Sequence, residues 1–474
     1  MAKNNSNFLF QRKFAFDYWD KKTTSLSFDF AKDYKKFLSS CKTERKTVNW
    51  IEGEARKIGY QVLQNIGPNT KKPKSLAGKK FYNINRGKSI IFAHFGKKKI
   101  SDGLHLISAH IDSPRLDLKM QPFYEQEHLG YLKTHYYGGI KKYQWTALPL
   151  AIYGVVVKTG GSVINIELGE KEDEPVLMIS DLLPHLSKEQ MEKKLEEAVK
   201  AEELNLIIGN IAQPGKKEEE NRVKKNLLSL LNKKYDITEE DFISADLEIV
   251  PVGQARDLGF DSSLITGYGQ DDKICAFAAS RALFDLKNPE FTSLVILVDR
   301  EEIGSEGATG ATSNFIIDFI GELLYLEQGE YNENYLRDVL SLSKAISADV
   351  TAGFDPDYAD VFDPNNTARL GAGVVLVKYT GQKGKAYTSE ATAEYMAYIR
   401  KILNTAKINW QTGSLGKIDI GGGGTIAMFL ARHNVDIVDC GPPILSMHAP
   451  FEISSKADLY SSYQFYKAFF GAKK

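Results

Sequence analysis

The sequence predicts an α/β fold whose alternation of strands and helices is interrupted by a differently composed middle segment. Strand and helix patterns alternate up to about residue 117 and resume beyond Gly267. Between them lie strand-like stretches rich in Tyr, Val and Ile, followed by a highly charged region. At 474 residues, the chain is also too long for one small core. We therefore expect one α/β domain, residues 1–117 and 252–474, with a second domain, 118–251, inserted into it.

The first α/β segment is expected to begin with a helix. Residues 26–66 carry apolar side chains on one helical face, among them Phe30, Phe37 and Ile51. A Gly/Pro/Lys stretch at 67–74 breaks this pattern. Strands are expected at 80–84, 89–95 and 104–108, and the last of these leads into Ala109–Pro114.

The middle segment reads as strands followed by charged helices. Glycine pairs at Gly138 and Gly160 break the strand-like region 119–180. Amphipathic patterns predict helices at 188–206 and 218–233, and the charged run 213–220 predicts a solvated loop. Beyond Gly267 the expected strands are 294–298 and 374–379, and the expected helices are 276–284, 315–326, 335–346, 392–401 and 424–432.

Composition excludes several classes of function. Lys+Arg and Asp+Glu are both 61, so the chain lacks the basic excess of proteins that bind nucleic acid or anionic membranes. No apolar run reaches the roughly eighteen residues of a membrane span, and the first residues lack the apolar core of a signal peptide. The three cysteines form no close-spaced motif, which favours a reducing compartment. We expect a cytoplasmic protein.

The most informative feature is a pair of carboxylates at the end of a buried strand. The apolar run 294–298 is followed by Asp299, Arg300, Glu301 and Glu302. Adjacent carboxylates repel each other and resist desolvation, and a bound cation relieves both problems. Ligands in open α/β sheets bind outside the carboxyl ends of strands. One Glu could thus be a metal ligand beside a general base; the alternative is a solvated charged loop.

Other potential ligands occupy similar places. His110 follows a strand, and Asp112 lies on the same face of extended chain and could orient its imidazole. Asp271 stands before a helix rich in small residues, where it could bridge two cations or simply cap the helix. Asp349 ends an apolar stretch, and His448 lies in a Pro-rich segment.

Together these residues form a possible two-cation site. A set of nitrogen and oxygen ligands without cysteine suits zinc, cobalt or manganese. His110, Asp271, Glu302, Asp349 and His448 would give two cations a shared carboxylate. Glu301 would remain to activate a metal-bridging water, as in two-metal aminopeptidases.

At this point the residues match a family. The matching motifs are Ser108–Pro114 (SAHIDSP), Gln270–Lys273 (QDDK), Asp299–Ser305 (DREEIGS), Ser347–Val350 (SADV), Gly421–Thr425 (GGGGT) and Ser446–His448 (SMH). They occur in family order from 108 to 448, and the chain resembles the M18 metallo-aminopeptidases, of the aspartyl aminopeptidase and vacuolar aminopeptidase I type. The resemblance implies a mixed-sheet, zinc-peptidase-like catalytic domain with helices on both faces, interrupted by a β-rich dimerisation domain.

The resemblance also implies roles. His110 and Asp349 would bind one metal, Glu302 and His448 the other, and Asp271 would bridge them. Asp112 would orient His110, and Glu301 would be the general base. Asp272 stands where the family often has Asn, and Arg300 departs from the commoner Asn.

Further implications concern substrate and assembly. Family members are large homo-oligomers, typically dodecamers, that associate through the inserted domain. His185 resembles a residue that reaches a neighbouring subunit's site, and Lys378 and Tyr387 resemble residues that line the substrate site. Gly423 and its neighbours would let backbone N–H groups approach the substrate. From the residues alone, His185 could lie on the surface, Lys378 could face solvent, and the glycines could form only a tight turn.

The expected function is removal of the N-terminal residue from peptides with two divalent cations per subunit, zinc first and cobalt or manganese as alternatives. Lys378 would favour an acidic N-terminal residue by charge pairing. The alternatives are a related two-metal carboxypeptidase or deacylase, and a non-enzymatic oligomeric scaffold on the same fold.

Overall fold

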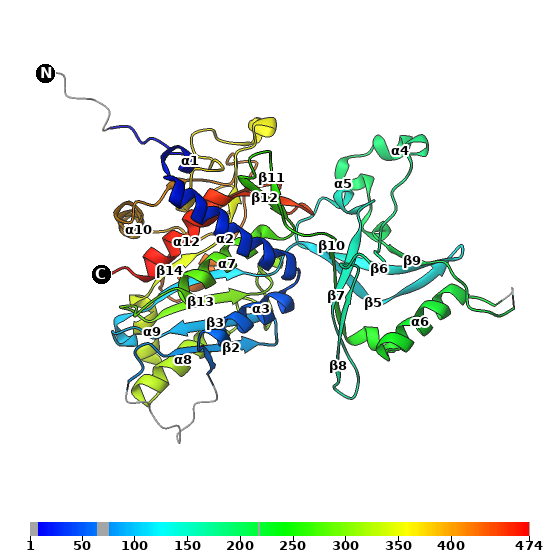
Figure 1. Cartoon of the computed structure of the whole chain (residues 1–474), viewed down its shortest axis with the longest axis horizontal. Coiled ribbons are helices and arrows are strands. Elements are labelled where there is room, and N and C mark those ends of the chain that lie inside the picture. The colour runs from blue at the N-terminus through cyan, green and yellow to red at the C-terminus, as the bar shows by residue number, and fades with distance from the viewer. Residues whose placement is uncertain (1–7, 64–74, 217–218, 474) are drawn as a thin grey trace.

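The computed structural model describes residues 8–63, 75–216 and 219–473 (Figure 1). Within these residues the strands form a nine-stranded, a six-stranded and a five-stranded sheet. Helices cover the nine-stranded sheet, and the six-stranded sheet projects from its side (Figure 1). The predicted α/β class is confirmed. The domain boundaries at 117/118 and 251/252 stay a prediction.

The nine-stranded sheet carries four neighbouring parallel strands at its centre. Its order is β1 (Gln61–Val62), β2 (Lys80–Asn85), β3 (Ser89–His94), β13 (Ser293–Val298), β4 (His105–His110), β14 (Lys344–Ser347), β18 (Asp436–Gly441), β16 (Val374–Val377) and β17 (Trp410–Thr412). Strands β13, β4, β14 and β18 run parallel to one another. In their register Val298 pairs with His110, and Ser347 pairs with Ser108. Their carboxyl ends therefore meet at one edge of the sheet.

Helices pack on both faces of this sheet. One face is covered by α2 (Lys21–Ser40), α3 (Glu44–Lys57), α7 (Gln270–Phe284), α10 (Ala393–Thr405) and α12 (Lys456–Phe470). The other carries α8 (Phe315–Gln328), α9 (Glu333–Leu342) and α11 (Ala427–Ala431), while the short α1 (Ala15–Tyr18) precedes α2.

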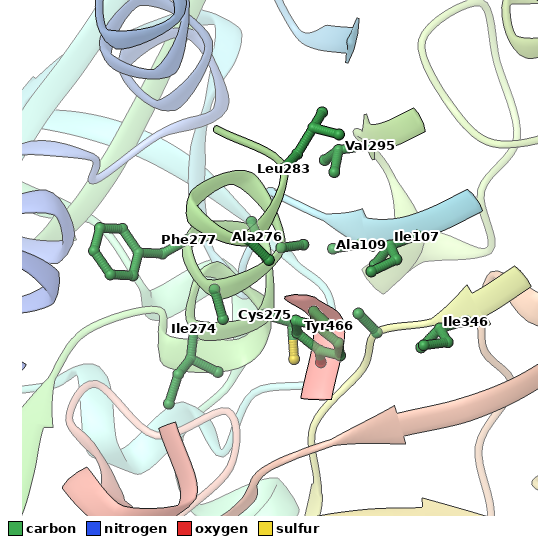
Figure 2. Close-up of a cluster of buried hydrophobic side chains, with 14 of the residues drawn as sticks. Ile107, Ala109, Ile274, Cys275, Ala276, Phe277, Leu283, Val295, Ile346 and Tyr466 are labelled. Atoms are coloured by element: carbon green, nitrogen blue, oxygen red, sulfur yellow. The ribbon is translucent and has the colours of Figure 1, made fainter. Parts of the chain in front are cut away.

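Helix α7 is almost entirely buried in the core. Its residues Cys275 and Ala276 lie on the side that faces Ile107 and Ala109 of β4, and Phe277 points to the opposite side (Figure 2). Small side chains along α7 let its backbone approach the sheet closely, which fixes the start of this helix relative to the strand ends.

The six-stranded sheet is antiparallel and has a core of its own. Its order is β8 (Val163–Leu168), β7 (Leu150–Val157), β10 (Ala245–Pro251), β5 (Arg115–Gln126), β6 (Leu129–Tyr137) and β9 (Leu206–Gly209). Trp145, Leu150 and Ile249 are fully buried in that core, and α6 (Arg222–Tyr235) packs alongside β5 and β6. Strand β5 begins directly after Pro114, so the segment leading from β4 enters this sheet at once.

The five-stranded sheet joins distant parts of the chain. Its order is β11 (Arg256–Leu258), β12 (Leu264–Gly267), β20 (Glu452–Ser455), β19 (Pro443–Leu445) and β15 (Thr351–Ala352). Gly267 pairs with Glu452, which places the segment between β19 and β20 beside the start of α7.

Three predicted helices were wrong in extent. The expected helix 26–66 is two helices, because Thr43 accepts a hydrogen bond from the Lys46 amide and starts α3 anew. The region 188–206 forms only one-turn helices, α4 (Lys188–Met191) and α5 (Leu195–Ala198), since none of their residues is buried. The helix expected at 335–346 ends at Leu342, because 344–347 pairs as β14 between β4 and β18.

The remaining differences are smaller. The helix expected at 424–432 begins only at Ala427, and α12 was not predicted. Some expected segments lie partly or wholly outside the described residues. These are the end of the helix expected at 26–66, the stretch 67–74, and residues 217–218, which belong to the loop expected at 213–220 and the helix expected at 218–233. In the described part of the chain, no helix has the length and apolar character needed to cross a bilayer. The cytoplasmic location stays a prediction.

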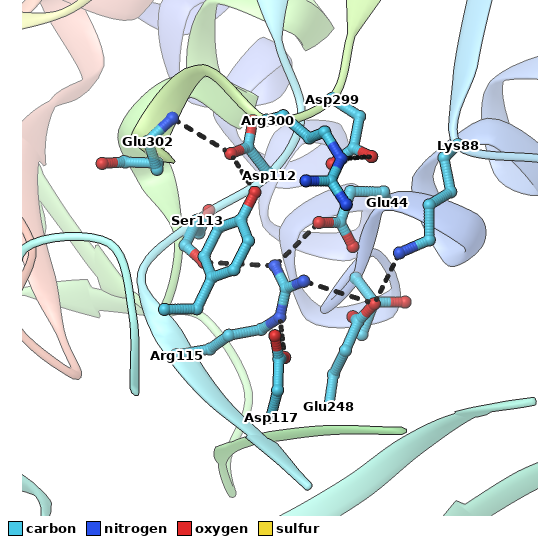
Figure 3. Close-up of polar contacts among 12 residues, drawn as sticks. Glu44, Lys88, Asp112, Ser113, Arg115, Asp117, Glu248, Asp299, Arg300 and Glu302 are labelled. Carbon is cyan, nitrogen blue, oxygen red and sulfur yellow. Dashed lines mark hydrogen bonds and ion pairs between the residues drawn. The ribbon is translucent and has the colours of Figure 1, made fainter. Parts of the chain in front are cut away.

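A buried ionic cluster joins the two larger sheets at the start of β5. The Arg115 guanidinium contacts Glu44 Oε1 at 2.7 Å, Asp117 Oδ1 at 2.8 Å and Glu248 Oε1 at 3.6 Å (Figure 3). Lys88 Nζ lies 3.6 Å from the same Glu248 oxygen. Burial opposes ionisation of Glu44, but Arg115 and Lys88 outweigh it and hold the Glu44 pKa below its ordinary value.

Arg115→Met should lower the free energy of unfolding by about 3–5 kcal/mol, because it leaves buried carboxylates without their main partner. The measurement is urea unfolding followed by circular dichroism. Arg256→Met, at an exposed position of β11, is the control and should change stability by less than about 0.5 kcal/mol. Equal stability of the two variants would contradict this account of the junction.

Candidate metal centre

Three neighbouring strand ends supply the first part of the site. His110 ends β4, and Asp112 follows it. Glu301 and Glu302 form a single helical turn after β13. Asp349 follows β14. These strands are parallel neighbours, so the side chains that follow them gather at one edge of the sheet.

Two further segments complete the cluster from outside the sheet. Asp271 lies at the start of α7, and its peptide bond to Asp272 is cis. The Asp271 carboxylate lies between two imidazoles: Oδ1 is 3.1 Å from His110 Nε2, and Oδ2 is 3.3 Å from His448 Nε2. Glu302 Oε2 is 3.4 Å from the same His448 nitrogen. The structure thus brings together His110, Asp271, Glu302 and His448.

Both imidazoles are oriented through their Nδ1 atoms. His110 Nδ1 lies 3.1 Å from the Asp112 carbonyl oxygen and 3.3 Å from Asp112 Oδ1. His448 Nδ1 lies 2.9 Å from the Gly139 carbonyl oxygen, which can only accept. A proton on Nδ1 leaves each Nε2 free as a ligand atom, the arrangement typical of metal-binding histidines.

The donor set fits divalent cations. Two groups among the described residues could hold an ion: His110 with Asp271 and Glu302, and His110 with Asp272 and Asp349. Glu302 Oε1 and both carboxylate oxygens of Asp272 are buried without a hydrogen-bond partner. Buried carboxylates need such a partner, and nitrogen and oxygen ligands without sulfur suit zinc.

The protein alone supplies too little positive charge to balance the carboxylates of the cluster. Burial raises the pKa of Glu301 to about 7, and burial together with Asp271 raises the Glu302 pKa well above its ordinary value. Burial opposes the imidazolium form of His448, but Asp271 and Glu302 outweigh it and raise its pKa to about 10. Divalent cations would favour deprotonation of all of these groups.

Sequence reasoning missed Glu452. This buried carboxylate accepts hydrogen bonds from the backbone N–H of Asp271 (3.0 Å) and of His448 (2.8 Å). It therefore ties the start of α7 to the segment that carries His448. The only sequence signal is one carboxylate in the apolar stretch after Pro450.

A cavity of about 1050 Å³ opens from the cluster. His110, Asp271, Glu301, Glu302, Asp349 and His448 lie on its wall, together with Gly423, Lys383, Lys385 and Lys417. The substrate-site roles of Lys378, Tyr387 and His185 stay predictions. Lys378 pairs with Glu390 at 3.5 Å, and Tyr387 is 80% exposed. His185 is exposed in a turn after β8.

Family comparison agrees with this geometry. Residues 37–470 match the model of the family described as aminopeptidase I zinc metalloprotease (M18). The chain belongs to the M18 family. This confirms the resemblance drawn from the sequence motifs.

Relatives in the M18 family cover almost the whole chain. A probable M18 family aminopeptidase 1 of Clostridium acetobutylicum is 48% identical over 98% of this chain and 99% of its own. The crystal structure of a Thermotoga maritima M18 aminopeptidase superposes with a TM-score of 0.92 at 44% identity, covering 98% of this chain and 99% of the other. Aminopeptidase I of C. acetobutylicum gives a TM-score of 0.91 at 45% identity, covering 98% and 100%. The protein is therefore an M18 metallo-aminopeptidase, which sets aside the scaffold alternative.

Zinc affinity should rise with pH. Burial opposes protonation of the two imidazoles, but the neighbouring carboxylates outweigh it and raise the pKa of both, so protons compete with zinc and raising the pH weakens this competition. We expect the zinc dissociation constant to fall at least about tenfold between about pH 6 and pH 8. Isothermal titration calorimetry in buffers of different ionisation enthalpy would measure both the constant and the protons released.

The control is His128→Ala, at an exposed position, which should keep this dependence. His448→Ala should weaken binding and flatten the dependence. A dissociation constant independent of pH in the unaltered protein would contradict the assignment of the imidazoles as ligands.

Proposed function

We propose that the protein is a two-cation aminopeptidase whose ions share Asp271. His110 and Asp349 would hold one ion, and Glu302 and His448 the other. The observation that carries this proposal is the position of Asp271, whose two oxygens each face a different imidazole nitrogen. Asp272 lies with His110 and Asp349 and would support the first ion. Zinc is the expected metal, with cobalt and manganese as alternatives for assay.

Bound cations would polarise the scissile carbonyl and ease deprotonation of the attacking water. Glu301 would act as the general base. Its carboxylate lies 3.9 Å from His110 Nε2 on the cavity wall. Its pKa, raised by burial to about 7, suits a group that takes a proton from water near neutral pH and returns it to the leaving amine.

Asp112 fixes the direction of both glutamates. Its Oδ1 accepts from the Glu301 backbone N–H and its Oδ2 from that of Glu302, each at 3.1 Å. The turn after β13 is thereby held against β4, with Glu302 toward His448 and Glu301 toward His110.

Glu301→Gln should lower kcat by at least about 10²–10⁴-fold while zinc content stays near that of the unaltered protein, because the variant loses the base and keeps the ligands. His448→Ala should instead lose zinc. Metal analysis and hydrolysis of aminoacyl p-nitroanilides measure the two properties separately. Glu306→Gln, at an exposed position nearby, is the control. Full activity of Glu301→Gln would overturn its role.

We further propose a preference for acidic N-terminal residues. Lys383, Lys385 and Lys417 line the cavity and would supply positive charge for an acidic side chain, in addition to the predicted role of Lys378. The free α-amino group of a peptide would lie at the carboxylate-rich end of the cavity, where one of the two cations could bind it. Gly423 would present backbone to the substrate on the same wall.

The specificity test uses matched peptides with Asp, Glu, Leu or Lys at the N-terminus, each free and N-acetylated. An acidic-preferring aminopeptidase should cleave the free Asp and Glu peptides with the highest kcat/KM and leave all acetylated peptides intact. Lys417→Met should reduce the ratio of Glu to Leu cleavage. Cleavage of acetylated peptides would favour the carboxypeptidase or deacylase alternative.

Self-association is the last part of the proposal. Apolar side chains are exposed on the segment between β8 and β9, among them Leu183 (48%), Leu186 (68%) and Met191 (77%). Burial of such side chains favours association, and we propose a homododecamer in which this segment, including His185, meets a second copy. Light scattering of the purified protein distinguishes this assembly from a dimer or monomer.

A further inference from the structure

The segment Tyr137–Gly139, at the end of β6, reaches from the six-stranded sheet to the metal centre. The Tyr137 hydroxyl donates a hydrogen bond to Asp112 Oδ2 at 2.9 Å. Two residues later, the Gly139 carbonyl oxygen lies 2.9 Å from His448 Nδ1. One short segment thus contacts the groups that orient both imidazoles, His110 through Asp112 and His448 directly.

Glycine at positions 138 and 139 makes this approach possible. Gly138 has a φ of +71°, and a Cβ there would lie 3.3 Å from the Cβ of Glu302. A Cβ on Gly139 would lie 3.3 Å from His448 Nδ1. Both contacts are tighter than ordinary van der Waals distances, so a larger residue at either position would press on a proposed ligand.

Asp112 depends on the Tyr137 hydroxyl for part of its support. This fully buried carboxylate also accepts from the backbone N–H groups of Glu301 and Glu302 and lies 3.3 Å from His110 Nδ1. Its four contacts come from three separate segments, and Tyr137 is the contact contributed by the six-stranded sheet.

The Tyr137 ring is itself held in place. The Arg115 guanidinium stacks 3.9 Å from the ring centroid, and Glu44 and Glu248 hold that guanidinium in the buried junction (Figure 3). A continuous set of contacts therefore leads from the junction of the two sheets through Arg115, Tyr137 and Asp112 to His110.

We propose that Tyr137 is a positioning residue for the metal centre and that the Tyr137–Gly139 segment couples the six-stranded sheet to metal binding. This inference rests on the proposed function, in which His110 and His448 hold the cations. Tyr137 acts through Asp112, on the tautomer and direction of His110, and Gly139 acts through its carbonyl oxygen on His448. Partners of this kind typically contribute about ten- to hundredfold to metal affinity.

Tyr137→Phe tests the hydroxyl alone, since the ring that stacks on Arg115 is kept. The expected result is zinc affinity about ten- to hundredfold weaker in competition with a chromogenic chelator, with a changed visible absorption spectrum of the cobalt-loaded protein. In the zinc-saturated enzyme kcat should fall with KM nearly unchanged. Tyr136→Phe, at the neighbouring half-exposed tyrosine, should match the unaltered protein in every measurement.

Gly139→Ala provides a second test that leaves Tyr137 intact. Its new methyl group should displace the His448 imidazole, weaken zinc binding and alter the cobalt spectrum. Gly160→Ala is the matched control, because a Cβ at Gly160 meets nothing within 4 Å. Thermal unfolding of the metal-free variants separates a local effect from loss of the fold.

The outcomes are distinguishable. Unaltered protein that binds no zinc would overturn the proposed function itself. Unaltered protein that binds zinc, together with Tyr137→Phe and Gly139→Ala variants of equal affinity and unchanged cobalt spectrum, would overturn only the positioning role. Weaker binding by both variants, with normal controls and intact folding, supports it.

Discussion

The Asp271 carboxylate, held between two imidazoles, is the contact on which the account of this protein depends. One oxygen faces His110 and the other faces His448, in surroundings where Glu301, Glu302 and Asp349 are also buried or nearly so. Carboxylates so close together cannot all remain ionised without positive charge beside them. The carboxylates and imidazoles around Asp271 are therefore arranged to bind cations.

The fold meets this constraint by bringing five parts of the chain together. Parallel pairing of β13, β4 and β14 places three sets of polar residues at neighbouring strand ends. The deep packing of α7 brings Asp271 down to them, and the pairing of β12 with β20 carries His448 to the other side. The Glu452 carboxylate accepts hydrogen bonds from the backbone N–H groups of Asp271 and His448 and so holds these two segments together.

Sequence reasoning succeeded where the signal is local and failed where distant segments decide. The apolar run before Glu301, and the strand before His110, predict strand ends that the structure confirms. Most of strand β14 was predicted as the end of a helix. A short apolar stretch has no clear periodicity of its own, and pairing with β4 decides its conformation. Tyr137 and Glu452 could not be found from the sequence, since Tyr137 contacts Asp112 and Glu452 contacts Asp271, 25 and 181 positions away in sequence. The substrate-site role of Lys378 rests on a sequence motif and stays a prediction.

The most direct measurement of the central claim is a crystal structure of the zinc-loaded protein, with anomalous diffraction data collected on both sides of the zinc absorption edge. We expect two zinc peaks per chain, one at each oxygen of Asp271, with His110 and Asp349 at one and Glu302 and His448 at the other. A single peak, or peaks that leave Asp271 without a metal contact, would contradict the claim.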